Sequence, residues 1–308
     1  MNQHIRTIAI LGAGAVGSYL VMGLSDKYKE NLWVIADGER KDRLAKNGLN
    51  INDKVYSLHI KTPAEAHGVD LLFVCTKYTQ LRDSLPDIET ITDKHTMVVS
   101  LLNGVDSEEL IDQRIGMEHM IYSLIRIASH RIGNSIHFSL PKGYNGIYIG
   151  IPNQPACQDP RLAAIAEIFA DTPVTLHLSD DILLDMWDKF GLNVSRNLPQ
   201  AILGVGIGVY DDSIYTDAIM RRMRHEVVLV ANAKGIPLTD EFKAAKWLPS
   251  QRYSTLQDLD AHRHTEIDMF SGALIRMGKE VGVECPYNEM TYNLIKALEE
   301  KNDGKFDY

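Results

Sequence analysis

The chain has 308 residues, which suggests about two domains, and 32 basic against 41 acidic residues give it a formal charge of −9. Its content of 45% apolar and 24% charged residues is average for globular proteins and excludes a disordered chain. The lack of a basic excess argues against a nucleic-acid partner. Cys75, Cys157 and Cys285 are far apart, which indicates reduced thiols and neither a disulfide framework nor a zinc cluster.

An apolar stretch at residues 7–22 resembles the core of a signal peptide, but three glycines interrupt it. No other stretch approaches the length of uninterrupted apolar sequence that a membrane span requires. We therefore expect a cytoplasmic protein without a membrane segment.

Strand and helix patterns alternate along the first part of the chain. Apolar runs predict strands at 5–11, 31–37, 69–77 and 96–104, and helical patterns follow at 18–28, 39–47 and from about Ser107. Short strands with turns are expected at 119–150, then a helix at 161–171 and a strand at 174–179. This alternation predicts an α/β domain with a doubly wound parallel sheet over residues 1–180.

Helical periodicity dominates beyond residue 180. The pattern predicts helices at 180–197 and 213–234, a long helix from Ser254 to about Val281, and a last helix from Pro286 to about Lys301. Residues 181–308 should therefore form an all-helical domain.

The sequence GAGAVG at 12–17 fits a dinucleotide-binding pattern directly after a strand and before a helix. Gly12 allows the tight turn, Gly14 lets the backbone approach a pyrophosphate, and Gly17 packs the helix against the strand. We expect a Rossmann-type domain, with cofactor contacts from Gly12, Ala13, Gly14, Ala15, Val16 and Gly17.

Asp37 ends the second predicted strand, where a carboxylate can bind the adenosine ribose and repel a 2′-phosphate. It favours NAD(H). Arg40, Lys41 and Arg43 follow directly; they either serve a phosphate or form a solvated first helical turn.

Lys189, Asn193 and Asn197 are spaced four residues apart, which places them on one face of a predicted helix. A lysine among apolar neighbours loses hydration of its charged form and can act as the general acid in carbonyl reduction. Asn193 and Asn197 could bind the lysine and the substrate. The alternative is a solvent-facing lysine with two surface amides.

Ser254 begins an S-x-x-Q sequence, which predicts that it caps the helix that follows. The same helix N-terminus suits a substrate carboxylate. Asp258, His262 and Glu266 recur at four-residue spacing, a pattern typical of a solvated charged face, and we predict no metal site.

Together these features resemble the ketopantoate reductase (2-dehydropantoate 2-reductase) family over essentially the whole chain. The matching segments are ILGAGAVGSYL, VCTKYTQ, SLLNGVDSEEL, MWDKFGLNVSRN, STLQDLDAHRHTEID and GVECPYNEMTYNLI.

The resemblance implies reduction of an α-keto acid with NADP(H), a step toward pantothenate. It implies that Lys189 is the catalytic acid, that Glu266 binds the substrate hydroxyl, and that Ser254 helps to hold the carboxylate. Asn193 and Asn197 would line the substrate pocket. Asn103 would lie near the nicotinamide and the reacting carbonyl, and Lys77 would lie near the cofactor.

Two features depart from the family pattern. Asp37 stands where relatives commonly carry an arginine for the 2′-phosphate, which puts the NADPH preference in doubt. Gly204, Gly206 and Gly208 follow Asn197 in a segment where relatives place polar contacts, which puts pantoate specificity in doubt.

Two other function classes stay open. A related β-hydroxyacid or opine-type dehydrogenase would share the Lys-x-x-x-Asn helix without needing Glu266. A non-enzymatic regulator that senses a dinucleotide would need none of Lys189, Asn103 and Glu266. A homodimer is compatible with the sequence, although no long heptad run points to one.

Overall fold

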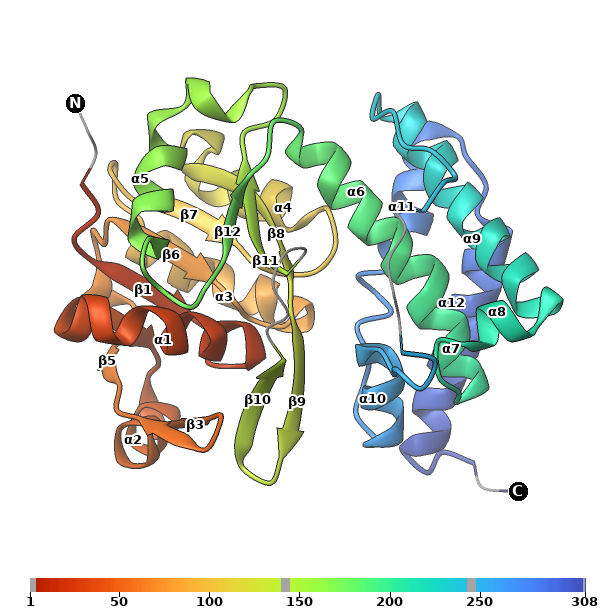
Figure 1. The fold of residues 1–308 in the computed structure, drawn as a ribbon, viewed down its shortest axis with the longest axis horizontal. Coiled ribbons are helices and arrows are strands. Elements are labelled where there is room, and N and C mark those ends of the chain that lie inside the picture. Colours follow the sequence, from red (N-terminus) through yellow and green to blue (C-terminus); the bar gives the residue numbers. More distant parts are fainter. Residues whose placement is uncertain (1–3, 140–144, 243–247, 307) are drawn as a thin grey trace. The chain divides into compact units, whose positions relative to one another are not determined.

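The computed structural model describes residues 4–139, 145–242, 248–306 and 308, and it divides into two compact units, Met1–Leu183 and Leu184–Tyr308. The first unit is α/β and the second is all-helical (Figure 1). The predicted fold class is therefore confirmed. The division lies in the first turn of a helix that begins at Ile182, whereas the sequence placed it after residue 180.

The first unit contains an eight-stranded sheet of order β12-β11-β8-β7-β6-β1-β2-β5. Its neighbours pair in parallel except β8 and β11, which are antiparallel. The strands are β1 (Ile8–Leu11), β2 (Leu32–Ile35), β5 (His59–Lys61), β6 (Leu71–Val74), β7 (Met97–Ser100), β8 (Met120–Arg126), β11 (Gly146–Gly150) and β12 (Leu176–Leu178).

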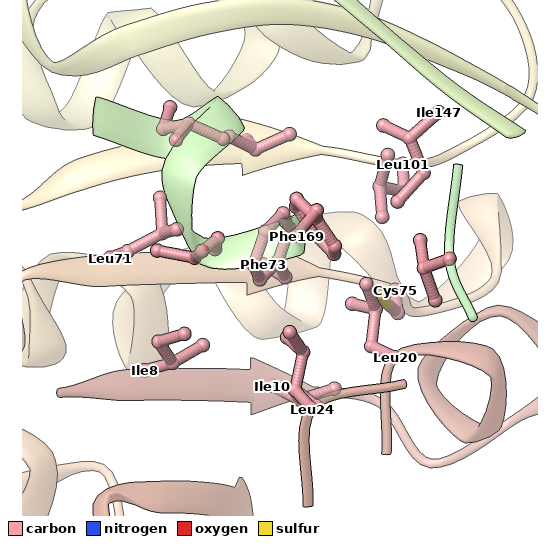
Figure 2. Packing of buried hydrophobic residues seen from close by; sticks show 14 of the residues in the cluster. Ile8, Ile10, Leu20, Leu24, Leu71, Phe73, Cys75, Leu101, Ile147 and Phe169 are labelled. Carbon is pink, nitrogen blue, oxygen red and sulfur yellow. The ribbon is translucent and has the colours of Figure 1, made fainter. Parts of the chain in front are cut away.

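Helices cover both faces of this sheet, so strands β1 and β6 are apolar at every position. In β1, Ile8 and Ile10 pack with helices α1 and α5 on one face, as Figure 2 shows in part, while Ala9 and Leu11 pack with α3 and α4 on the other. The helices are α1 (Ala15–Tyr28), α2 (Gly38–Asn47), α3 (Tyr78–Ile91), α4 (Ser107–Ile115) and α5 (Pro160–Phe169). Short 3-10 turns cover Lys29–Asn31, Ala64–Ala66, Met117–His119 and Ala156–Gln158.

A second sheet of order β4-β3-β10-β9 completes the first unit. Its strands are β3 (Leu49–Ile51), β4 (Lys54–Tyr56), β9 (Ala128–Ile132) and β10 (Ser135–Ser139). The sequence predicted short strands at 119–150, of which residues 140–144 lie outside the described ranges. It did not predict β3, β4 and β5, because strands of three residues are too short to show a periodicity.

In the second unit, α9 contacts α7, α8, α11, α12 and the π-helical segment that follows α6. Glu226 of α9 accepts hydrogen bonds from the backbone N–H groups of Tyr287 (2.8 Å) and Asn288 (3.0 Å). Its carboxylate therefore pairs two N–H groups in the first turn of α12 that have no partner within the helix. The elements are α6 (Ile182–Leu192), a π-helical segment (Asn193–Asn197), α7 (Leu198–Leu203), α8 (Val209–Asp212), α9 (Ile214–Ala233), α10 (Ser254–Asp260), α11 (Ser271–Val281) and α12 (Pro286–Asn302).

The predicted helices at 213–234 and 286–301 are confirmed, but the long helix from Ser254 to Val281 is wrong. The helix stops after Asp260 and a new one begins at Ser271. Between them, Thr265 donates its N–H and its hydroxyl to the buried Glu299 carboxylate, each at 2.7 Å, and this contact from a distant part of the chain replaces helical bonding. No helix within the described ranges is long and apolar enough to cross a membrane.

Candidate active site

The glycine-rich loop joins β1 to α1, and its three glycines have different environments. Gly12 has φ +109°, and a Cβ there would lie 2.6 Å from the Cys75 carbonyl carbon. A Cβ on Gly17 would lie 2.0 Å from the Gly12 carbonyl oxygen, so the fold itself requires both glycines. A Cβ on Gly14 would meet nothing within 4 Å. The open space beside Gly14, at the N-terminus of α1, fits a dinucleotide pyrophosphate.

A pocket of about 240 Å³ lies at the carboxyl ends of β1, β2 and β6. Asp37 lines it directly after β2, together with Arg40, Asp83 and Asp87. Burial, and then the charge of Asp37, raise the pKa of Asp87. Three carboxyl groups against one cation make the pocket acidic, which favours hydroxyl groups over a phosphate.

The basic residues after Asp37 are dispersed. Arg40 lines the acidic pocket, Lys41 pairs with Glu65 at 3.0 Å, and Arg43 lines a different pocket of about 720 Å³ together with Ala13. These three side chains do not form one phosphate site.

Lys77 and Asn103 follow the carboxyl ends of two paired parallel strands, β6 and β7. Lys77 is exposed and immediately precedes α3, and Asn103 is half-buried in the loop before α4. Because parallel strands end at one edge of the sheet, both residues lie at the edge that carries the glycine-rich loop.

A buried polar cluster near Asn103 was not predicted. The Ser107 hydroxyl donates to the Glu108 carboxylate at 2.8 Å and lies 2.8 Å from the Ser100 hydroxyl, and the Ser123 hydroxyl donates to the Ser100 carbonyl. Burial raises the pKa of Glu108 to about 7. In the sequence, Glu108 resembles any solvated acid in the first turn of a helix, so no signal there could have identified it.

In the second unit, the predicted helix at 180–197 forms but changes type. Lys189 is half-buried on α6, whereas Asn193 and Asn197 lie in the π-helical segment. The Asn197 amide donates to the Asn193 amide oxygen at 3.4 Å, which brings these two side chains together. The Asn197 amide oxygen is buried and has no hydrogen-bond partner among the described residues. A buried acceptor of this kind can bind a ligand, and π-helical turns occur frequently at functional sites.

A buried ion pair supports the helix turn that carries Lys189. The Arg224 guanidinium is 1% exposed and binds both the carboxylate (3.1 Å) and the backbone carbonyl (3.2 Å) of Asp188. A Cβ on Gly191 would lie 2.1 Å from Arg224 Nη1, so this position accepts only glycine without rearrangement. The sequence did not indicate this pair, because Arg224 stands among the charged residues of an amphipathic helix.

Ser254 is the first residue of α10, and the preceding Tyr253 occupies the cap position without a side-chain hydrogen bond. The predicted capping box is therefore wrong: Gln257 donates its side-chain amide to the Arg252 carbonyl at 2.8 Å. Ser254 is exposed at the start of a helix that contacts the π-helical segment.

Asp258, His262 and Glu266 do not form a stripe on one helix, because α10 ends at Asp260 and His262 has φ +50°. Glu266 is half-buried between α10 and α11. The residues that the structure describes contain no group of His, Cys, Asp or Glu side chains arranged to hold a metal ion.

The first unit thus brings the glycine-rich loop, Asp37, Lys77 and Asn103 to one edge of its sheet. The second unit places Lys189, Asn193 and Asn197 along one continuous helical segment, with Ser254 on a neighbouring element. Binding of a dinucleotide and donation of a proton to a carbonyl oxygen are the chemistry that these groups can supply.

Known proteins resemble the chain along both units. A family profile described as Ketopantoate reductase PanE/ApbA matches residues 8–154, and one described as Ketopantoate reductase PanE/ApbA C terminal matches residues 181–299. The 2-dehydropantoate 2-reductase of Streptococcus pyogenes serotype M3 is 27% identical, over 95% of this chain and 97% of that protein.

Two solved structures are also similar. D-mandelate dehydrogenase with NADH and anilino(oxo)acetate matches with a TM-score of 0.82 and 26% identity, covering 96% of this chain and 99% of that one. The PanE/ApbA family ketopantoate reductase from Ralstonia eutropha JMP134 matches with a TM-score of 0.78 and 25% identity, at the same coverage of 96% and 99%.

Proposed function

The chain belongs to the ketopantoate reductase family, and we propose that it reduces the keto group of ketopantoate, or of a closely similar α-keto acid, to the hydroxy acid. The observation that carries the proposal is the side-chain set Lys189, Asn193 and Asn197 in a chain that also has a dinucleotide-binding loop. Relatives named 2-dehydropantoate 2-reductase support the same reaction.

Each site residue has a role in this proposal. A bound nicotinamide dinucleotide supplies the hydride. Lys189 gives a proton to the substrate oxygen as the carbonyl carbon is reduced, and the Asn197 amide oxygen, buried without a protein partner, accepts a hydrogen bond from the substrate or from Lys189.

The remaining site residues bind the substrate. Ser254 and the N–H groups of the first turn of α10 hold the carboxylate, and Glu266 accepts a hydrogen bond from the substrate hydroxyl. In the first unit, Asn103 and Lys77 are assigned to the binding of the nicotinamide cofactor.

We further propose that NADH is preferred over NADPH. The pocket beside Asp37 also contains Asp83 and Asp87. A 2′-phosphate placed there would be repelled by these carboxylates, and Arg40 is the single cation among the described lining residues. The structure of D-mandelate dehydrogenase, which holds NADH, supports this preference.

The test is steady-state oxidation of NADH and of NADPH with ketopantoate and a panel of α-keto acids. We expect turnover of ketopantoate and a higher kcat/KM with NADH. A higher kcat/KM with NADPH would overturn the cofactor proposal, and turnover of other keto acids alone would overturn the substrate.

A 2-hydroxyacid dehydrogenase acting on an aromatic substrate is the second candidate. It is favoured by the likeness to D-mandelate dehydrogenase, which is 26% identical to this chain with a TM-score of 0.82. Phenylglyoxylate in the keto acid panel separates the two candidates.

A further inference from the structure

A tyrosine hydroxyl interrupts the backbone ladder of the helix that carries the site asparagines. The Tyr210 hydroxyl donates to the Arg196 carbonyl and accepts the N–H of Gln200 at 3.2 Å. Residues 196 and 200 are four apart, so this carbonyl and this N–H bond each other in a regular α-helix. The phenol oxygen therefore bridges one step of the ladder, and insertions of this kind redirect a helix.

The bridge lies at Arg196, one residue before the end of the π-helical segment. Asn197 follows Arg196 directly, and Pro199 in the same turn has no N–H to offer the carbonyl of Ser195. Tyr210 is 7% exposed, and its burial raises the pKa of the phenol, so the hydroxyl keeps its proton and its role as donor. The Tyr210 contact is thus adjacent in the chain to Asn197, whose buried amide oxygen has no hydrogen-bond partner among the described residues.

Gln200 extends this contact to a second part of the site. Its side chain is fully buried; the amide N–H donates to the Gln251 carbonyl at 2.8 Å, and the amide oxygen accepts the Tyr253 N–H at 2.9 Å. Residues 251–253 lead directly into Ser254. One side chain therefore fixes the backbone that delivers the start of α10.

The glycine-rich segment before Tyr210 makes the bridge sterically possible. The N–H groups of Ile207 and Gly208 donate to the carbonyls of Gln251 (3.0 Å) and Pro249 (2.9 Å). A Cβ on Gly206 would lie 2.3 Å from the Pro249 carbonyl oxygen, so only glycine permits this approach. The segment that departs from the family pattern is thus the one that brings Tyr210 to the helix.

We propose that Tyr210 and Gln200 are positioning residues. They hold Asn197 and Ser254 in the relative positions that bind the keto acid, an inference that rests on the proposed function. In this role Tyr210 acts through its hydrogen bonds to the helix backbone and does not contact the substrate. Loss of the bridge lets the helix turn and the start of α10 shift relative to each other.

The test compares Tyr210→Phe with wild type, using ketopantoate and NADH. We expect the KM for ketopantoate to rise on the order of ten-fold, with a smaller fall in kcat and an unchanged Kd for NADH. Tyr19→Phe is the control, because Tyr19 is also buried but lies on α1, and it should leave the KM unchanged. A Tyr210→Phe KM within two-fold of wild type would overturn the proposal.

Hydrogen–deuterium exchange without substrate separates this inference from the proposed function. Tyr210→Phe should lose amide protection at 193–200 and also at 251–256, whereas a purely local role would affect only the contacts of Tyr210 itself. Gln200→Leu should give the same two-segment pattern. If wild type turns over no keto acid, the proposed function fails. Whatever that result, a change in amide exchange that Tyr210→Phe confines to residues 196–210 would overturn the positioning role.

Discussion

Glu108 is a carboxyl group whose burial has a measurable consequence for stability. Burial raises its pKa from an ordinary 4.5 to about 7, and the Ser107 hydroxyl partly offsets this rise. The folded chain therefore holds a proton on Glu108 that the unfolded chain has already lost between these two values. The stability that this proton contributes is fully present below pH 4.5 and is lost as the pH rises through about 7.

The first prediction is that Glu108→Gln removes this pH dependence. Wild type should lose on the order of 3 kcal/mol of its free energy of unfolding across that window, since each pKa unit is about 1.4 kcal/mol. The Gln variant, which still accepts the Ser107 hydrogen bond, should not show this loss. Urea denaturation at pH 5 and pH 8 measures the difference, and Glu109→Gln, an exposed neighbour in the same helix turn, should behave as wild type.

The second prediction concerns Lys189. Lys189→Ala should lower kcat by about 10²–10⁴-fold, because the substrate oxygen loses its proton donor, while the Kd for NADH stays within two-fold. Stopped-flow turnover and NADH fluorescence titration give the two values. Lys279→Ala, an exposed lysine on α11, is the control and should keep full turnover. An unchanged kcat in Lys189→Ala would mean that Lys189 is not the proton donor.

The loop between β1 and α1 makes a prediction in which two glycines behave differently. Gly17→Ala places a Cβ 2.0 Å from the Gly12 carbonyl oxygen, so it should destabilise the first unit by several kcal/mol, on the order of an overpacked core. Gly14→Ala meets no protein atom within 4 Å and should keep its Tm.

Gly14→Ala should nevertheless weaken NADH binding at least ten-fold, because its methyl group occupies the space that the pyrophosphate approaches. Thermal unfolding and NADH titration of both variants check the pair. Equal NADH affinity in Gly14→Ala and wild type would contradict a dinucleotide at this loop.

The sequence predicted those elements whose signals are local. The apolar run 5–11 followed by three spaced glycines specifies β1, the turn and α1, because both sheet faces are covered and the turn needs φ > 0 at Gly12. The break at Asp260 depends on Glu299, which is remote in the sequence from Thr265, and periodicity cannot detect such a contact.

The candidate site divides in the same way. Lys189 and Asn193 could be selected because their spacing is that of a helix face. The residues that support them could not be selected from the sequence. Arg224 and Tyr210 contact α6 and the π-helical segment only in the folded chain, and in the sequence they resemble a surface cation and a loop aromatic. The residues proposed to bind a ligand follow a local pattern, whereas the residues proposed to position them depend on tertiary packing.

At the scale of the whole molecule, the net charge of −9 opposes the proposed substrate, which carries a carboxylate. An anion can still bind well if local groups create a positive potential that outweighs the long-range field. In the proposed function, each unit supplies such groups by itself: Lys77 in the first, and Lys189 with the start of α10 beside Ser254 in the second.

The salt dependence of KM tests which contribution dominates. Screening acts over about 30 Å at 0.01 M salt and about 8 Å at 0.15 M. If short-range attraction to these cations governs binding, KM for ketopantoate should rise on the order of three-fold across this range, because salt weakens the attraction. The uncharged amide of ketopantoate is the control and should show a flat response. A KM that falls with salt would mean that repulsion by the acidic surface dominates. A KM that does not change with salt would mean that these cations do not contribute to substrate binding.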